Sequence, residues 1–584
     1  LYFENSSTTN LTKEKIINAG NINGTATSSV GIFYNPNELD STAVGTALVE
    51  NTGNITFAGD KNVGIYAEKD KNNTGYIVEN KRDITLTTAS ASLQDPNVGV
   101  FANSENIQIR NDAGANIKVS DRSVGIYGHT VDNNGNITVG DAGVAIYSQS
   151  GNVNVNSGTI TTGENNAVGV YTTGAGQTVT VANGANLSIG TGSIGTANVN
   201  SSKLAGNQIV SNAASVNLKD NSVYIYSVDT LGTVSNNTNI TSTGTAGNNF
   251  GIYSNGNVTN TGTVNLSSGI GNVGIYVYDA AGKALNTGTI SVGASNSTTD
   301  SYSIGMAAKN GATVENAYGR TINVTGDGGI GMYATGSGSK AINRGNIDLS
   351  GNNSIGMYLD DNAVGENYGT IQTTATSTGD GIIGVYTINN SVIKNYGTIR
   401  IVSKNGIGVY VSANSDLNPN GNITASGTGS EAIYKSSASD TSKGVEGISL
   451  DLPAIGSPTA IVTREGKIIS PSVVDTDSVT PNPNYIKAGA TTIDLSTFNS
   501  LYTENNGGGK ADIGMYVDTS GVNYTNPIEG LENLKNLRTV NLLFGVEAAQ
   551  YTPAKDIIVG DNIKTHNKTA IKTVNLKNPA VKWD

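Results

Sequence analysis

One phrase recurs along most of the chain: an aliphatic residue, usually glycine, a second aliphatic residue and then an aromatic one. In one stretch its first residue falls at 304, 330, 355, 383 and 407, so the steps are 26, 25, 28 and 24 residues. A fixed period of this length is typical of solenoid proteins, in which each repeat stacks on its neighbours. The period therefore predicts a stack of repeats and not a set of globular domains. Clear copies begin at Val63, Val124, Val273, Ile330, Ile383 and Ile407.

A second phrase alternates with the first and reads Asn, any residue, Gly, any residue, then Ile or Val. After it, apolar and polar residues alternate, as in Ile347-Asp348-Leu349, and this period of two predicts a half-buried strand. We expect its Asn and Gly to form a turn, because both tolerate positive φ. The first phrase also reads as a strand, with Val63 and Ile65 on one face and Gly64 and Tyr66 on the other. Copies of the second phrase begin at Asn51, Asn286, Asn343 and Asn395.

Each repeat thus holds at least two short strands and no helix. A repeat of about 25 residues with short strands and no helix does not fit a leucine-rich βα unit. It is also too short for a propeller blade of about 40 residues. The sequence therefore predicts an all-β fold, a right-handed parallel β-helix with irregular loops, in which each coil rises about 4.8 Å. Residues 1–435 would form about 17 coils at this period.

The regular pattern stops after residue 435. Residues 436–511 carry several prolines, which suit an irregular segment packed on the β-helix or protruding from it. The first phrase returns at 513–516, so residues 512–584 are expected to resume or cap the β-helix. Leu531, Leu534 and Leu537 predict one short helix there, and residues 556–559 and 571–576 predict strands.

Insertions are expected to gather at one edge of the stack. The distance from the first phrase to the next turn Asn is nearly constant, whereas the distance onward from that Asn varies. Loops at 293–303 and 373–380 would therefore line up on one side. In the N-terminal third, the longer excursions 35–47, 68–79 and 88–97 are candidate binding loops.

Composition excludes several kinds of site and partner. The chain has 584 residues, a net charge of -12 and no Cys. It therefore has no disulfide and no Cys-ligated zinc or iron–sulfur centre, and no basic stripe for nucleic acid. Its apolar runs are shorter than the roughly 18 residues that a membrane-spanning helix needs. We expect no cofactor and no metal.

Catalytic signatures are also missing from the sequence. His129 and His566 lie far apart, each in a polar stretch, and no Gly-x-Ser-x-Gly elbow or phosphate loop occurs. The carboxylates are dispersed, although Asp360-Asp361 and Asp475/Asp477 are close in sequence. We therefore expect no catalytic residue. Because β-helices also host polysaccharide lyases and hydrolases with clustered carboxylates, a carbohydrate-active enzyme remains the alternative function.

The aromatic residues of the first phrase are expected to form a ladder along the stack. Exposed aromatic rings can stack on sugar faces, so a glycan platform is one interpretation. The favoured interpretation is that the rings stack on one another and cover the β-helix. The tyrosines concerned are Tyr66, Tyr127, Tyr147, Tyr171, Tyr226, Tyr253, Tyr276, Tyr333, Tyr358, Tyr386, Tyr410 and Tyr434.

With these phrases, the whole chain resembles the passenger region of large fusobacterial type V autotransporter adhesins of the RadD type. The runs at 514–521 (Gly-Met-Tyr-Val-Asp-Thr-Ser-Gly) and 525–531 (Thr-Asn-Pro-Ile-Glu-Gly-Leu) carry the resemblance further. It implies a bacterial adhesin on the cell surface, anchored at the outer membrane by a β-barrel outside this chain. Expected partners are host-cell receptors, glycans or other bacteria, with the chain as a monomer. Tyr485, Phe498 and Tyr502 are candidate binding residues, and a passive stalk is a further alternative.

Overall fold

The chain is an all-β parallel solenoid. The computed structural model describes residues 1–4, 14–39, 41–92, 95–412, 414–419 and 421–435, and beyond them the backbone of short strands between 462 and 577. The described residues form about 15 turns with no α-helix, and the predicted fold class is confirmed. None of them belongs to a helix that is long and apolar enough to cross a membrane.

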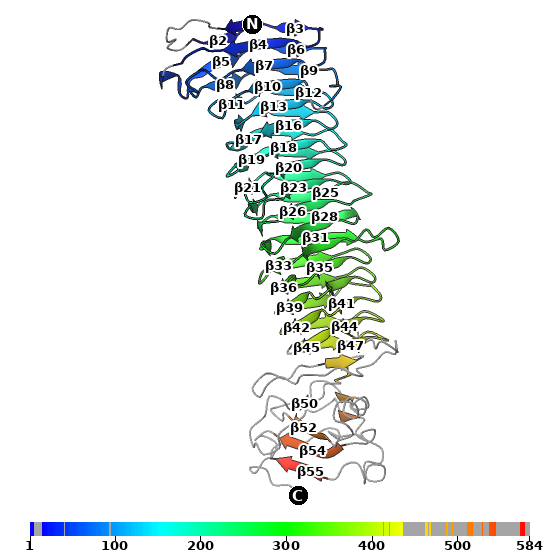
Figure 1. Ribbon diagram of the computed structural model, residues 1–584. Coiled ribbons are helices and arrows are strands. Elements are labelled where there is room, and N and C mark those ends of the chain that lie inside the picture. The colour runs from blue at the N-terminus through cyan, green and yellow to red at the C-terminus, as the bar shows by residue number, and fades with distance from the viewer. Residues whose placement is uncertain are drawn as a thin grey trace. The chain divides into compact units, whose positions relative to one another are not determined.

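Two compact units divide the chain, unit 1 (Leu1–Glu315) and unit 2 (Asn316–Asp584). A coil of unit 1 consists of β7 (Val63–Ala67), β8 (Ile77–Asn80) and β9 (Ile84–Leu86). The next coil consists of β10 (Val98–Ala102), β11 (Gln108–Asn111) and β12 (Asn116–Val119). Each strand pairs in parallel with its counterpart, and Figure 1 shows this stacking through unit 1 in blue to green.

Each coil therefore has three strands, one more than the two that the phrases identified. The coils of unit 1 are also uneven, because the first phrase recurs at 30, 63, 98, 124 and 144, in steps of 33, 35, 26 and 20 residues.

Aliphatic side chains fill the inside of each coil. Ile65 and Ala67 of β7 and Ile84 of β9 are fully buried, and Tyr66 stays partly exposed. The expected alternation along the first phrase is wrong at one point, since Gly64 is buried beside Ile65 and does not share the outer face with Tyr66. Two consecutive residues of the first phrase, Gly64 and Ile65, are therefore buried.

A ladder of buried asparagines lines the turn between the second and third strands, here called the asparagine corner. In unit 1 the side-chain amide of Asn18 donates to Asn51 at 2.7 Å, and Asn51 donates to Asn80 at 2.9 Å. The series continues through Asn111 and Asn133. These amides satisfy one another inside the stack, where an unpaired polar group would cost about 1–3 kcal/mol.

This ladder corrects the role expected for the second phrase. Neither Asn51 nor Gly53 has a positive φ. Gly53 is needed for a different reason, because a β-carbon there would overlap the backbone carbonyl of Gly20 in the preceding coil. Asparagine holds neighbouring coils together, and glycine lets their backbones approach.

Where valine interrupts the ladder, the corner disappears. Val155 and Val181 take the place of asparagine in two successive coils. There the second and third strands fuse into β17 (Val153–Thr161) and β19 (Thr178–Ile189). The side-chain bonds resume with Asn236, which donates to Asn260 at 2.8 Å. The intervening coil has Ser211 at this position and again has separate strands, β21 (Gln208–Ser211) and β22 (Ser215–Leu218), so the corner is lost where valine, not serine, replaces asparagine.

Two kinds of loop leave the stack in unit 1. In the excursions 35–47 and 68–79, Leu39 and Tyr76 are buried, and Asp70 accepts the backbone N–H of Leu39 at 2.9 Å. The loop at 293–303 follows the third strand, as predicted, and projects beside β31 (Thr289–Ala294) in Figure 1. Backbone bonds between Asn296 and Ser301, at 2.7 and 3.0 Å, close it into a hairpin.

Unit 2 repeats the same coil. In one coil, β35 (Ile330–Thr335), β36 (Lys340–Asn343) and β37 (Asn346–Leu349) pair with β38 (Ile355–Asp360), β39 (Val364–Asn367) and β40 (Thr370–Thr373) of the next. The loop at 373–380 follows the third strand, as predicted. Met332, Ile347 and Leu349 lie inside and are fully buried.

Four strands near the C-terminus form a parallel sheet. They are β50 (Ile486–Ala488), β52 (Ala511–Val517), β54 (Leu537–Phe544) and β55 (Thr573–Lys577). The returning phrase at 513–516 lies in β52, and the strand predicted at 571–576 overlaps β55. Leu537 begins a strand and not a helix, while Leu531, Leu534 and residues 556–559 lie outside the described residues. The domain boundaries at 435 and 511 stay predictions.

Candidate binding surface

The binding residues proposed from the sequence, Tyr485, Phe498 and Tyr502, lie outside the described residues. The predicted aromatic ladder lies within them. In unit 1 the rings of Tyr127 and Tyr147 are 4.8 Å apart and only 2° from parallel, and Phe101 stacks on Tyr127 at 4.9 Å. The prediction that the rings stack on one another is confirmed in this run, whereas in unit 2 Tyr358 meets Tyr333 and Tyr386 edge to face.

Stacking decides what the ladder can bind. In the run from Phe33 to Tyr171, each inner ring has an aromatic neighbour on both faces. A sugar ring needs a free aromatic face, and these faces are already covered. The run ends at Ala197, which occupies the ladder position and is only 2% exposed. In this run the inner rings therefore stabilise the sheet and present only ring edges and hydroxyls.

A different set of aromatic side chains is exposed in unit 2, outside the asparagine corner. Tyr368 and Tyr396 are 42% and 43% exposed, and their rings stack at 4.9 Å and 10°. The guanidinium of Arg344 lies over the other face of Tyr368, 4.6 Å from the ring centre. All three occupy the variable position between the Asn and Gly of the second phrase. Burial raises the pKa of Tyr368, and the hydrogen bond to Glu366 adds to the shift.

The same corner of the preceding coil is longer and carries Tyr318. Four residues, 317–320, separate Asn316 from β34 (Thr321–Val324), where Arg344 and Gly345 alone separate Asn343 from β37. The N–H of Arg320 donates to the carbonyl of Ala317 at 3.1 Å, and Gly319 has φ of +70°. This matches a type II turn. The turn holds Tyr318 88% exposed.

The register of the coil is kept despite the two extra residues. The carbonyl of Arg320 accepts the N–H of Asn346 at 2.7 Å, and the N–H of Arg344 donates to Asn316 at 2.8 Å. Asn316 also donates its side-chain amide to Asn343 at 3.1 Å. Tyr318, Arg344, Tyr368 and Tyr396, here called the exposed aromatic row, therefore stand on a fixed backbone.

The sequence reading passed over this row because the residue between Asn and Gly was treated as arbitrary. A usable signal was present. The dipeptide Tyr-Gly recurs at 318–319, 368–369 and 396–397, each time one or two residues after the turn Asn. An aromatic side chain at an outward-facing turn position cannot pack into the core, so it is expected to be exposed to solvent.

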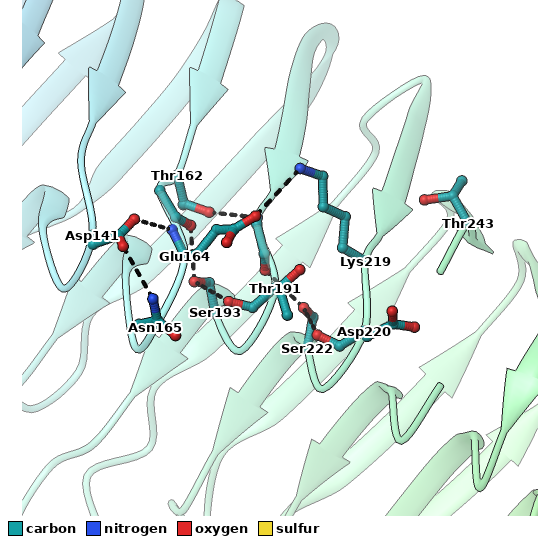
Figure 2. Close-up of polar contacts among 12 residues, drawn as sticks. Asp141, Thr162, Glu164, Asn165, Thr191, Ser193, Lys219, Asp220, Ser222 and Thr243 are labelled. Carbon is teal, nitrogen blue, oxygen red and sulfur yellow. Dashed lines mark hydrogen bonds and ion pairs between the residues drawn. The ribbon is translucent and has the colours of Figure 1, made fainter. Parts of the chain in front are cut away.

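The carboxylates of unit 1 have structural partners. Figure 2 shows the turns before the first strands of successive coils, where Asp141 accepts the N–H of Glu164 at 2.8 Å and the amide of Asn165 at 3.0 Å. These bonds lower the pKa of Asp141. Lys219 and Glu164 form an ion pair at 3.8 Å, but both are more than half exposed, so it contributes at most about 1 kcal/mol.

The titratable side chains of His129 and Asp229 in unit 1 also have hydrogen-bond partners. His129 is within 2.7 Å of the Ser150 hydroxyl, and burial lowers its pKa. Asp229 is fully buried and accepts the N–H of Asn207 at 2.7 Å. Groups of three or more His, Asp or Glu placed to hold a metal ion do not occur among residues 1–435 as described, nor in the described strands beyond.

Comparison with protein families matched the BigA third pectate lyase-like domain over residues 4–177 and again over 177–407. Neither the curated proteins nor the solved structures gave a match. The two matched segments run end to end and together cover more than half of the 584 residues. The chain therefore belongs to the family of the BigA third pectate lyase-like domain.

Proposed function

We propose that the chain is a bacterial surface adhesin, part of the passenger of a fusobacterial type V autotransporter at the outer membrane. It would attach its cell to host cells or to other bacteria and act as a monomer. The exposed aromatic row carries this proposal, because Tyr318, Tyr368 and Tyr396 present phenol rings to solvent beside an arginine. Tyrosine and arginine are the residues most enriched at binding hot spots.

Rigidity supports the same function. The row stands on strands held by backbone ladders and by the bonds from Asn316 to Asn343 and from Asn343 to Asn367. A binding surface on a fixed backbone loses little conformational entropy when it engages a partner. Weak contacts of this kind become strong attachment when many copies act together on one cell.

Attachment is tested with the full chain coupled to beads and exposed to epithelial cells or partner bacteria. We expect the beads to bind cells, and the triple variant Tyr318→Ser/Tyr368→Ser/Tyr396→Ser to lose most of that binding. Tyr302→Ser, which removes a tyrosine 39% exposed in unit 1, is the matched control. Equal binding by the triple variant contradicts the role of the row, and no binding by the intact chain leaves a passive stalk.

We propose attachment in preference to catalysis. The carboxylates at the turns of unit 1 support this, since Asp121 and Asp141 already accept backbone N–H groups at 2.9 and 2.8 Å. A glycosidase or lyase needs carboxylates poised to exchange protons with the substrate. Incubation with polygalacturonate and other polysaccharides should release no unsaturated or reducing ends. Release of either product would favour the enzyme.

A further inference from the structure

The turn at 317–320 presents two side chains that its own fold does not use. Tyr318 is 88% exposed, and it makes no hydrogen bond or ring contact with the described residues. The Arg320 side chain is exposed and forms no ion pair with them. The backbone of Arg320 is nevertheless fixed, because its carbonyl accepts the N–H of Asn346 and the amide of Asn316.

Two positively charged side chains are exposed at this corner, although the chain as a whole is negatively charged. The net charge is -12, yet Arg320 and Arg344 are both exposed here. Glu366 is engaged by the hydroxyl of Tyr368 at 3.1 Å and by Lys394 at 3.8 Å, and Glu315 also has a partner. The turn therefore offers a guanidinium and an aromatic face to an anion that carries an apolar side.

A sugar acid matches this pair better than a peptide does. The C–H face of a pyranose packs on a single aromatic ring, and a carboxylate accepts two parallel N–H bonds from a guanidinium. A protein partner would need an apolar pocket around the anchor residue. Tyr318 instead has small or polar neighbours in sequence, namely Asn316, Ala317, Gly319 and Arg320, and no large apolar side chain among them.

We infer that the 317–320 turn binds a carboxylate-bearing sugar of a cell-surface glycan, with Tyr318 under the pyranose and Arg320 on the carboxylate. This rests on the proposed attachment function and names its ligand class.

The test is calorimetric titration of the full chain with 3′-sialyllactose, a glucuronate-containing hyaluronan tetrasaccharide and neutral lactose. At least one acidic probe should bind ten-fold or more tightly than lactose, and which one does so identifies the source of the carboxylate. Arg320→Gln and Tyr318→Ser should each weaken that binding at least ten-fold. Both side chains are exposed, so the unfolding midpoints should not change, and Tyr302→Ser should bind as the intact chain does.

Three outcomes overturn the inference. One is that neither acidic probe binds more tightly than lactose. Another is that Arg320→Gln binds as well as the intact chain. The third is that a tetraglutamate peptide binds as well as the sugars, which would show a general anion site. Cell attachment without acidic-sugar binding removes this inference and keeps the proposed function, whereas failure of attachment removes both.

Discussion

The side-chain amide of Asn343 donates a hydrogen bond to the amide oxygen of Asn367, 2.9 Å away in the next coil. Asn343 in turn accepts from Asn316 at 3.1 Å, and Asn367 donates to Asn395 at 2.8 Å. All four side chains are fully buried. Each of these four coils is thus joined to the next of the four by a side-chain bond as well as by its strands.

Replacing Asn343 with Ala should destabilise the chain strongly. The change leaves the side-chain oxygen of Asn367 without its donor inside the stack, while the amide of Asn316 keeps the carbonyls of Arg320 and Asn346. We expect a cost of about 1–3 kcal/mol of unfolding free energy. Denaturant unfolding followed by circular dichroism measures it. Asn346→Ala, at a partly exposed position of the same corner, should cost no more than about 0.5 kcal/mol. Equal costs would show that the ladder contributes nothing.

Gly53 and Gly20 occupy equivalent corners of two coils and should respond differently to Ala. A β-carbon on Gly53 would overlap the Gly20 backbone, whereas one on Gly20 meets nothing within 4 Å. We expect Gly53→Ala to cost about 2–3 kcal/mol, in the range for overpacking, and Gly20→Ala to be neutral or slightly stabilising. Thermal unfolding of the two variants distinguishes them. A tolerated Gly53→Ala would mean that the coils separate at little cost.

Replacing Tyr386 should affect the stability of the chain, whereas replacing Tyr318 should affect only its binding. The Tyr386 ring lies 4.4 Å from Tyr410 and 5.1 Å from Tyr358, so Tyr386→Ser should lower the unfolding free energy by about 2–3 kcal/mol. Tyr318→Ser should leave it unchanged. Parallel unfolding and cell-attachment measurements check both variants. Normal stability with lost attachment in Tyr386→Ser would return the stacked ladder to the role of glycan platform.

Alkaline pH should loosen unit 1 through its tyrosines. Burial, with a hydrogen bond from its hydroxyl to Glu68, raises the pKa of Tyr66 to about 12, and burial also raises the pKa of Tyr34 and Tyr76. An unfolded tyrosine titrates near 10, so the stabilisation is complete below about pH 10 and is lost as the pH rises toward 12. Absorbance at 295 nm and circular dichroism follow the change. A single titration step near pH 10 with intact β structure would contradict it.

The strands were predictable because apolar residues recur where the backbone must bury them. Ile65 and Ile347 lie in strands at the expected places, and both are fully buried. The third strand of each coil was harder to see, because β8 and β9 are short and a three-residue turn separates them. The sequence did not predict the side-chain hydrogen bond from Asn51 to Asn80. A turn asparagine and a ladder asparagine have the same sequence context, and only the position of the neighbouring coil distinguishes them.

The candidate surface was less predictable than the fold. Tyr368 and Tyr396 lie at a position where any residue is sterically allowed, so periodicity carries no information there. Tyr318 depends on two additional residues in one turn, which appear in the sequence only as a slightly longer spacing after Asn316. In this fold the residues that determine the chemistry of the surface are those that the repeat pattern does not constrain.

The four-residue turn at 317–320 has a practical consequence. It lengthens one corner while Asn316 still reaches Asn343 and Arg320 still accepts from Asn346. The same corner of other coils should therefore tolerate grafted peptides, such as an epitope or an affinity tag, with no change to the aliphatic interior. A protein built this way can vary its outward recognition elements coil by coil and leave its scaffold unaltered.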